Sequence, residues 1–271
     1  MVYSCAYFPT GTETLEAAQL AKLDHVLTKI MLKPGEKLLD IGCGWGALAI
    51  RAAEKFGAQV LGITLSKEQA ALAEERVKAA GLQDRVEIRI LDYRELPLDG
   101  QFDKITSIGM FEHVGLQHLT AYFGAICGLL KDGGLVMNHG ITSTDPGSGN
   151  TPLGAAEFID KYVFPQGELP HLSLAVRSMQ EAGLETLDVE TLRRHYARTL
   201  ALWARNYEDK ATALRGLVEE KTFRIWRIYL AGCAWAFEQN WISLHQILAC
   251  KAGVAPSFNP TPWSRGYMYA G

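Results

Sequence analysis

Short apolar runs alternate with segments of helical periodicity along much of the chain. Runs with the length of strands occur at 37–41, 59–63, 85–91, 102–108 and 135–141. Helical spacing separates them at 67–80 and 119–130, and an Asp132-Gly133-Gly134 turn precedes the fifth run. This alternation of strands and helices predicts a mostly parallel sheet with helices on both faces and a ligand site beyond the carboxyl ends of its strands.

The remaining pattern adds helices before and after these strands. Before the first strand, apolar residues near a helical period predict a helix with its buried face at Leu15, Leu20, Leu23, Leu27 and Ile30. A helix at 172–182 and a sixth strand at 185–189 are followed by a helical region at about 192–240 and a last strand at 241–248. The helical region therefore interrupts the connection between the last two strands, where we expect it to roof a substrate pocket.

Two segments lack either period. Residues 142–170 contain many Gly, Ser, Thr, Asn and Pro residues, and a connection of this length predicts a lid or binding loop. Residues 254–271 contain three prolines and the aromatic residues Trp263, Tyr267 and Tyr269, and this composition predicts a loose tail. We therefore expect a single domain over residues 1–253.

Composition narrows the function classes. The chain has 271 residues, of which 48% are hydrophobic, and a net charge of -3, so no global charge favours a nucleic-acid partner. It contains no apolar run of the ~18–20 residues that a membrane span requires and no signal peptide. Five scattered cysteines without a C-x-x-C pair argue against structural zinc, predict no metal site, and favour a reducing compartment such as the cytoplasm.

The first strand ends in a glycine-rich turn. Asp40 is followed by glycines at 42, 44 and 46 and then by a helix start at Ala47. A dinucleotide turn needs its third glycine at position 47, so this spacing instead favours the first motif of S-adenosylmethionine-dependent methyltransferases. A purely structural strand-to-helix turn remains the alternative.

Motifs along the chain resemble those of cyclopropane-fatty-acyl-phospholipid synthases, which are related to the mycolic acid cyclopropane synthases. The matching segments are YSCAYF at 3–8, LDIGCGWG at 39–46, GITLS at 62–66, SIGMFEHVG at 107–115, FIDKYVFP at 158–165, HYARTL at 195–200 and CAWAF at 233–237. The resemblance covers roughly residues 3–250 in the same order. It implies a class I (Rossmann-like) methyltransferase fold, α/β, with a seven-stranded mostly parallel sheet. Some members carry a further N-terminal domain, so this is either a short member or a catalytic part.

The resemblance also implies which residues contact S-adenosylmethionine. They are Tyr3 and Ser4 at the methionine end, Asp40, Gly42, Cys43, Gly44 and Gly46 in the turn, Thr64, Leu65 and Gln69 after the second strand, and Asp92 and Tyr93 at the adenine. Because no acidic residue follows the second strand, the hydroxyl of Thr64 and the amide of Gln69 are expected to bind the ribose without adding charge.

The implied reaction is cyclopropanation. A cis alkene attacks the methyl group of the sulfonium, and loss of a proton from the new methyl group closes the ring on the resulting carbocation. The resemblance implies bound bicarbonate as the base, held by Glu112, His139, Tyr196 and the backbone of Cys5 and Ile141. Aromatic rings would stabilise the cation, and the candidates are Tyr7, Phe8, Trp203 and Tyr229. Cys233 lies in a family motif, but methyl transfer to an alkene needs no covalent intermediate, so a buried structural cysteine is the better interpretation.

The predicted function is S-adenosylmethionine-dependent cyclopropanation of cis double bonds in the acyl chains of phospholipids. One alternative is a methyltransferase that forms methyl-branched or methylene products without ring closure, and another is a non-catalytic protein that binds S-adenosylmethionine. We expect peripheral membrane contact during catalysis, through Trp226, Arg224 and Arg227 or the aromatic N-terminal segment. An acyl chain bound to a carrier protein is the alternative substrate, and a homodimer is compatible with the sequence.

Overall fold

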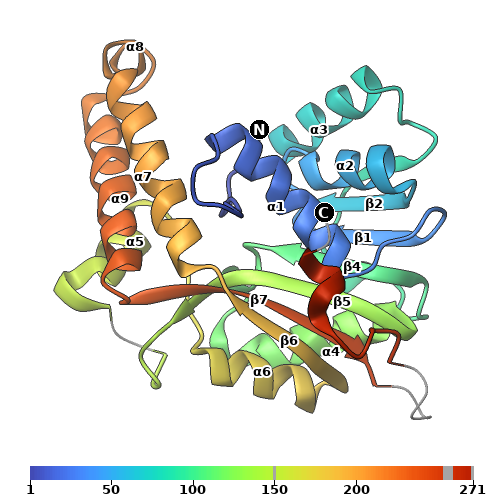
Figure 1. Ribbon diagram of the computed structural model, residues 1–271. Coiled ribbons are helices and arrows are strands. Elements are labelled where there is room, and N and C mark those ends of the chain that lie inside the picture. Colours follow the sequence, from blue (N-terminus) through green and yellow to red (C-terminus); the bar gives the residue numbers. More distant parts are fainter. Residues whose placement is uncertain (149–150, 253–258, 270–271) are drawn as a thin grey trace.

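One seven-stranded sheet carries the fold (Figure 1). The computed structural model describes residues 1–148, 151–252 and 259–269. The strands are β1 (Lys37–Ile41), β2 (Gln59–Thr64), β3 (Val86–Ile90), β4 (Phe102–Ile108), β5 (Leu130–Ser143), β6 (Leu184–Thr191) and β7 (Ile242–Lys251). Their order is β3-β2-β1-β4-β5-β7-β6, and only β7 is antiparallel to its neighbours. The predicted seven-stranded, mostly parallel sheet is confirmed.

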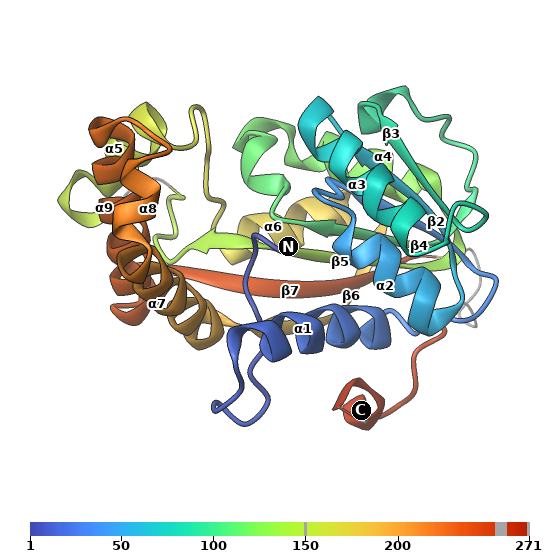
Figure 2. The same ribbon diagram turned by 90° about the horizontal axis from the view of Figure 1, so that it is seen from above.

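Helices cover both faces of the sheet (Figure 2). On one face lie α1 (Leu15–Lys29), α2 (Ala47–Phe56) and α3 (Lys67–Ala79), and on the other lie α4 (Leu119–Leu129) and α6 (Leu172–Glu181). Short 3₁₀ helices are η1 (Tyr93–Glu95), η2 (Phe111–His113), η3 (Leu116–His118), η4 (Pro152–Gly154) and η5 (Arg265–Tyr269). Each face buries its own apolar core, because side chains alternate along the strands.

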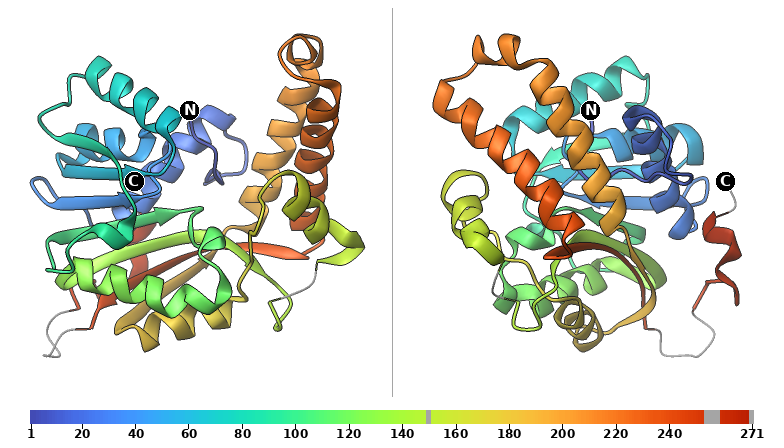
Figure 3. Two further views of the ribbon diagram at one scale, coloured as in Figure 1. Left: turned by 180° about the vertical axis from the view of Figure 1, so that it is seen from behind. Right: turned by 60° about the vertical axis from the view of Figure 1, so that its left-hand side comes forward.

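Three helices lie between β6 and β7. They are α7 (Arg193–Asp209), α8 (Ala211–Arg215) and α9 (Glu220–Glu238), and α7 and α9 rise together beside the sheet (Figure 3). Residues of α7 and α9 form a third apolar core with the N-terminal segment and with α5 (Ala155–Tyr162). This arrangement places a helical wall beside the end of the sheet where the glycine turn lies.

Two boundaries were predicted wrongly. The Asp132-Gly133-Gly134 turn does not precede β5 but lies inside it, as an irregularity where pairing with β4 shifts register between Phe102 and Lys104. Residues 142–170 are not a loop throughout, because β5 continues to Ser143 and α5 follows. Phe158 and Ile159 of α5 pack against the third core, and this burial supports a helix that its Gly- and Pro-rich flanks disguise.

The buried face of α1 also differs from the prediction. Leu20 is 51% exposed, whereas Lys22, His25 and Lys29 are buried against the sheet. Ion pairs compensate the charge of Lys29, whose Nζ lies 3.1 Å from Asp188 Oδ1 and 3.0 Å from Glu190 Oε2, both on β6. His25 Nε2 lies 2.7 Å from the same oxygen of Glu190. A polar stripe at helical spacing therefore faces the sheet rather than solvent.

The prediction of a loose tail is wrong for residues 259–269, while 254–258 and 270–271 lie outside the described residues. Met268 of η5 is buried against the α1 side of the sheet, and the Tyr267 hydroxyl donates to the carbonyl of Lys29 at 3.2 Å. Arg265 pairs with Asp188. Among the described helices, none is both long and apolar enough to cross a bilayer.

We expect Met268→Ala to loosen the docked tail, because truncating a buried methionine typically costs about 2–5 kcal/mol. Hydrogen exchange of the amides at 265–269 measures this effect and should accelerate at least tenfold. Trp263→Ala is the matched control, since the Trp263 side chain is fully exposed. Equal exchange in wild type and Met268→Ala would show that η5 does not depend on this contact.

Candidate active site

The glycine turn between β1 and α2 forms one end of the site. Gly42, Gly44 and Gly46 have φ values of 77°, 55° and 74°, which side chains with a Cβ rarely adopt. The amides of Gly42 and Cys43 donate to the carbonyl of Ile63 at 3.0 and 2.9 Å, so the turn is fixed to the end of β2. The turn leads into the N-terminus of α2, whose free N–H groups favour a polar or anionic ligand.

A cavity of about 1270 Å³ runs from this turn past the strand ends to α5 and α9. It is lined by these residues predicted to contact the cofactor: Tyr3, Ser4, Asp40, Gly42, Cys43, Gly44, Thr64, Leu65, Gln69, Asp92 and Tyr93. Cys5, Glu112, His139, Ile141, Tyr196 and Cys233 line the same cavity. Gly46 does not, and a Cβ there would lie 3.1 Å from Ala73 Cβ, so Gly46 serves the packing of α2 against α3.

Asp40 and Lys22 are buried groups of opposite charge that both line the cavity, without a direct ion pair among the described residues. Burial raises the pKa of Asp40 to about 6, although the Thr106 hydroxyl donates to it at 2.9 Å. The donor of this hydrogen bond lies on β4, and among the described residues the Asp40 side chain makes no hydrogen bond to the glycine turn. Lys22 donates to the Ser4 hydroxyl at 3.0 Å, and burial lowers its pKa to about 8. The sequence did not reveal Lys22 as a residue of the site, because a lone lysine on an amphipathic helix is normally solvated.

The predicted ribose contacts lie together at the end of β2. The Thr64 hydroxyl donates to Gln69 Oε1 at 2.9 Å, which leaves the amide NH₂ of Gln69 as the free donor of the pair. At the next strand, Asp92 caps η1 through the Arg94 amide at 2.9 Å and pairs with the Arg94 side chain. Tyr93 packs edge-on against Tyr122 with 5.3 Å between ring centroids. At the expected adenosine site, the side chains at the end of β2 are therefore neutral, and the carboxylate that follows β3 is already paired with an arginine.

Glu112 is a buried carboxylate with one free oxygen. Its Oε1 accepts the backbone N–H of Ile141 at 2.7 Å, and its Oε2 is buried without a partner among the described residues. Burial raises the pKa of Glu112 to about 7, in spite of that backbone hydrogen bond. Because the Ile141 amide is already used by Glu112, its role in the site is to orient this carboxylate.

His139 presents a second unpartnered atom to the cavity. It is 1% exposed, Nδ1 lies 3.2 Å from Gln246 Nε2, and Nε2 has no partner among the described residues. Burial, aided by the charges of Lys22 and Lys29, holds the pKa of His139 well below its usual value, so the ring is neutral. Gly140 follows it with no room for a side chain, since a Cβ there would overlap the ring of Phe111.

The other predicted reactive residues supply neutral groups. Burial raises the pKa of Tyr196 well above its usual value. The ring of Tyr196 packs against that of Phe237, with 4.7 Å between the ring centroids. Burial also raises the pKa of the Cys5 thiol, which donates to the carbonyl of Ala6 at 3.2 Å. The pKa of Cys233 is raised to about 12 by burial, so this cysteine stays a thiol and is unsuited to nucleophilic catalysis.

The aromatic wall differs from the predicted one. Of the four candidate rings only Tyr229 lines the cavity. Tyr7 stacks between His25 and His195, and Phe8 and Trp203 also lie outside the lining. Further rings that line it come from α5, its following loop, α9 and the residue before β7: Phe158, Phe164, Trp235, Phe237 and Trp241. Phe158 and Phe164 were not identified from the sequence because residues 142–170 were predicted as a loop.

Comparison with known proteins identifies the family of the chain. The family model for mycolic acid cyclopropane synthetase matches residues 1–247. The chain belongs to this family. It is 56% identical over 269 residues to a probable fatty acid methyltransferase of Pseudomonas putida, covering 99% of this chain and 68% of the relative. It is 38% identical over 248 residues to the cyclopropane-fatty-acyl-phospholipid synthase of Escherichia coli, covering 92% of this chain and 62% of the relative.

The fold of a solved structure matches as well. The crystal structure of the mycolic acid cyclopropane synthase CmaA1, complexed with SAH and CTAB, superposes with a TM-score of 0.86 at 34% identity, covering 92% of this chain and 90% of that one. The chain is therefore a class I methyltransferase dependent on S-adenosylmethionine, as the glycine turn and motifs predicted. It spans about two thirds of the length of the two curated relatives above.

The buried carboxylate gives a prediction about pH and stability. A carboxyl whose pKa rises from 4.5 to about 7 on folding stabilises the protein below pH 4.5, and this contribution is lost as the pH rises through 7. Glu112→Gln should therefore raise the free energy of unfolding by roughly 2–3 kcal/mol more at pH 8 than at pH 5. Urea unfolding in bicarbonate-free buffer measures it.

The control is Glu75→Gln, an exposed position on α3 whose effect should not depend on pH. An identical stability change for Glu112→Gln at both pH values would show that Glu112 titrates normally in the folded protein.

Proposed function

We propose that this protein transfers a methyl group from S-adenosylmethionine to a cis double bond in a fatty acyl chain and that the product closes to a cyclopropane. The observation that carries the proposal is a pair of buried atoms without a partner among the described residues, Glu112 Oε2 and His139 Nε2, which belong to side chains lining the cavity that contains the glycine turn. Buried polar atoms normally have partners, so this pair favours a small polar ligand beside the cofactor site.

Bicarbonate fits these residues. It is small, offers one O–H for the carboxylate oxygen of Glu112, and offers acceptor oxygens for neutral donors such as the Tyr196 hydroxyl. When bound, bicarbonate would supply the base that removes a proton from the newly added methyl group. Glu112 would orient it through a charge-assisted hydrogen bond, and the Ile141 amide would hold Glu112 in place.

The apolar part of the cavity suits an acyl chain. Phe158, Phe164 and Tyr229 offer ring faces that stabilise a carbocation without capturing it, because aromatic carbons carry no lone pair to attack. Cys233 lines the wall as a neutral thiol, so it does not compete for the methyl group. The residues of this chain therefore bind the alkene, exclude water from the cation and hold the base.

The second candidate is a methyl-branched or methylene product without ring closure. The name of the Pseudomonas putida relative, a probable fatty acid methyltransferase, favours this candidate as much as the first. The two reactions share the methyl transfer and diverge at the carbocation. For a methylene product, a 1,2-hydride shift first moves the cation to the methyl-bearing carbon, and a methyl proton then leaves; a saturated methyl branch would require a further reductant.

We expect the purified protein to convert cis-monounsaturated phosphatidylethanolamine and S-adenosylmethionine to a product with the high-field proton resonances of a cyclopropane. Added bicarbonate should raise the rate over carbonate-depleted buffer. Glu112→Gln should lower kcat at least 10²-fold, as expected for loss of a group that holds the base, while S-adenosylhomocysteine still binds.

A vinylidene or methyl-branch signal would establish the second candidate. Binding of S-adenosylhomocysteine without any lipid product from either phospholipid or carrier-bound acyl chains would favour a non-catalytic binding protein. Full turnover by Glu112→Gln would remove Glu112 from the base site.

We further propose that the cavity mouth rests on a lipid surface. Leu65, Leu153, Ile228 and Trp235 line the cavity yet are 71%, 84%, 58% and 45% exposed. Contact through Arg224 and Arg227 is less favoured, because these cations pair with Glu220 and Glu208. Trp226 packs against Tyr229 instead of projecting outward.

The double variant Leu153→Ser, Trp235→Ser should reduce sedimentation with phosphatidylethanolamine–phosphatidylglycerol vesicles at least tenfold, because two exposed apolar side chains no longer enter the interface. Leu98→Ser is the control, since Leu98 is 60% exposed but does not line the cavity. Absence of wild-type binding to anionic and neutral vesicles alike would favour a carrier-bound substrate.

A further inference from the structure

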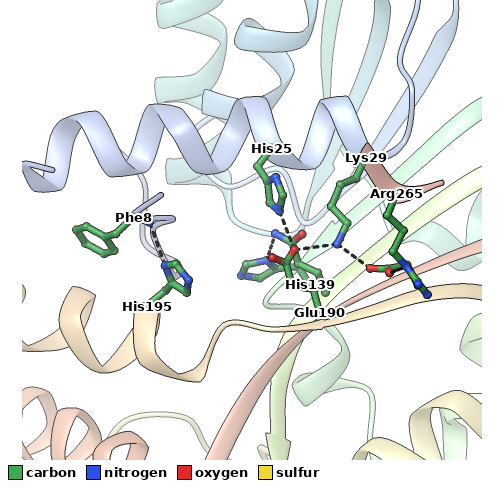
Figure 4. A network of polar contacts seen from close by, with 9 residues as sticks. Phe8, His25, Lys29, His139, Glu190, His195 and Arg265 are labelled. Carbon is green, nitrogen blue, oxygen red and sulfur yellow. Dashed lines mark hydrogen bonds and ion pairs between the residues drawn. The ribbon is translucent and has the colours of Figure 1, made fainter. Parts of the chain in front are cut away.

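A row of polar side chains crosses three strands behind the cavity (Figure 4). In the sheet register, Gln246 of β7 lies opposite His139 of β5 on one side and opposite Glu190 of β6 on the other. Facing residues of paired strands share a face, and His25 and Lys29 of α1 cover this one. Gln246 is completely buried, so its amide can interact only with protein groups.

The amide of Gln246 lies against one nitrogen of the His139 ring. Gln246 Nε2 is 3.2 Å from His139 Nδ1, whereas Gln246 Oε1 has no partner among the described residues. A neutral imidazole carries a single N–H, so a ring that accepts at Nδ1 must carry its proton on Nε2. Nε2 is the buried, unpartnered atom of His139, and this residue lines the cavity.

Burial, aided by the positive charges of Lys22 and Lys29, keeps His139 neutral by lowering its pKa. Glu190 is the anion of the row, and burial opposes its charge, but hydrogen bonds from His25 and Lys29 lower its pKa to about 2. The charge of Glu190 is therefore already compensated. In the register of the sheet, the neutral amide of Gln246 lies between Glu190 and His139. A carboxylate at position 246 would instead stabilise an imidazolium at 139.

We propose that Gln246 is a positioning residue that fixes His139 as the neutral tautomer with its proton on Nε2, so that the ring donates a hydrogen bond to an anion in the cavity. This tautomer matters because a neutral donor holds a bound anion, whereas an imidazolium would give its proton to an ion that must act as the base. The inference rests on the proposed function for its catalytic consequence, but the tautomer itself does not depend on turnover.

The test compares wild type with Gln246→Glu and Gln246→Met, in protein labelled with ¹⁵N-histidine. Loss of one ring signal in His139→Asn assigns His139. The wild-type ring should show a protonated Nε2 and an unprotonated Nδ1. Gln246→Glu should move the proton to Nδ1 or protonate both nitrogens, and Gln246→Met should give a mixture of tautomers. In both variants kcat should fall about 10–100-fold, the range for loss of a partner that orients a site histidine, with KM for S-adenosylmethionine changed less than about twofold.

Asn138→Leu is the matched control. Asn138 also carries a buried amide on β5, but its side chain points to the opposite face of the sheet and does not line the cavity. This variant should leave the His139 ring signals unchanged. A wild-type ring protonated at Nδ1, or a Gln246→Glu variant with wild-type kcat, would overturn the proposal. Wild type with the expected tautomer but without any lipid product would instead contradict the proposed function alone.

Discussion

The Glu112 carboxylate is buried, and among the described residues only one of its two oxygens accepts a hydrogen bond. The proposed ligand site depends on this difference between the two oxygens. A buried carboxylate with a single backbone donor raises its own pKa toward neutrality, and its second oxygen has no partner among the described residues. Such an arrangement lowers stability unless a ligand completes it. We therefore regard the free oxygen of Glu112 and the free nitrogen of His139 as two sides of one binding site.

The sheet provides the rigidity that this site needs. Glu112 lies in η2 after β4, and His139 lies in β5, which pairs with β4 on one side and β7 on the other. Behind His139, the buried ions of α1 and β6 stabilise the α1 face and are closed off by η5. The helix and strand that carry the buried ions, α1 and β6, thus also fix the positions of the neutral groups that face the cavity.

Local patterns were sufficient to predict the strands, most helices and the glycine turn, because these depend on period, length and turn residues. The Glu112 and His139 site came from resemblance, since neither residue is unusual in its own segment. What depends on contacts between distant segments was missed. The polar stripe of α1 has the spacing of a solvated face, and the burial of His25 and Lys29 is explained by Asp188 and Glu190 of β6. Gln246 gains meaning only from the register of β7 with β5. The cavity rings of α5 were hidden by glycine- and proline-rich flanks.

The central claim is that Glu112 and His139 hold one small anion beside the cofactor. A crystal structure of the protein soaked with S-adenosylhomocysteine and bicarbonate tests this claim most directly. A shared anion site predicts planar density for a three-oxygen ion within hydrogen-bond distance of both Glu112 Oε2 and His139 Nε2. It would be contradicted by an ion bound elsewhere, or by a Glu112 side chain that turns to a donor of the protein and leaves the site empty.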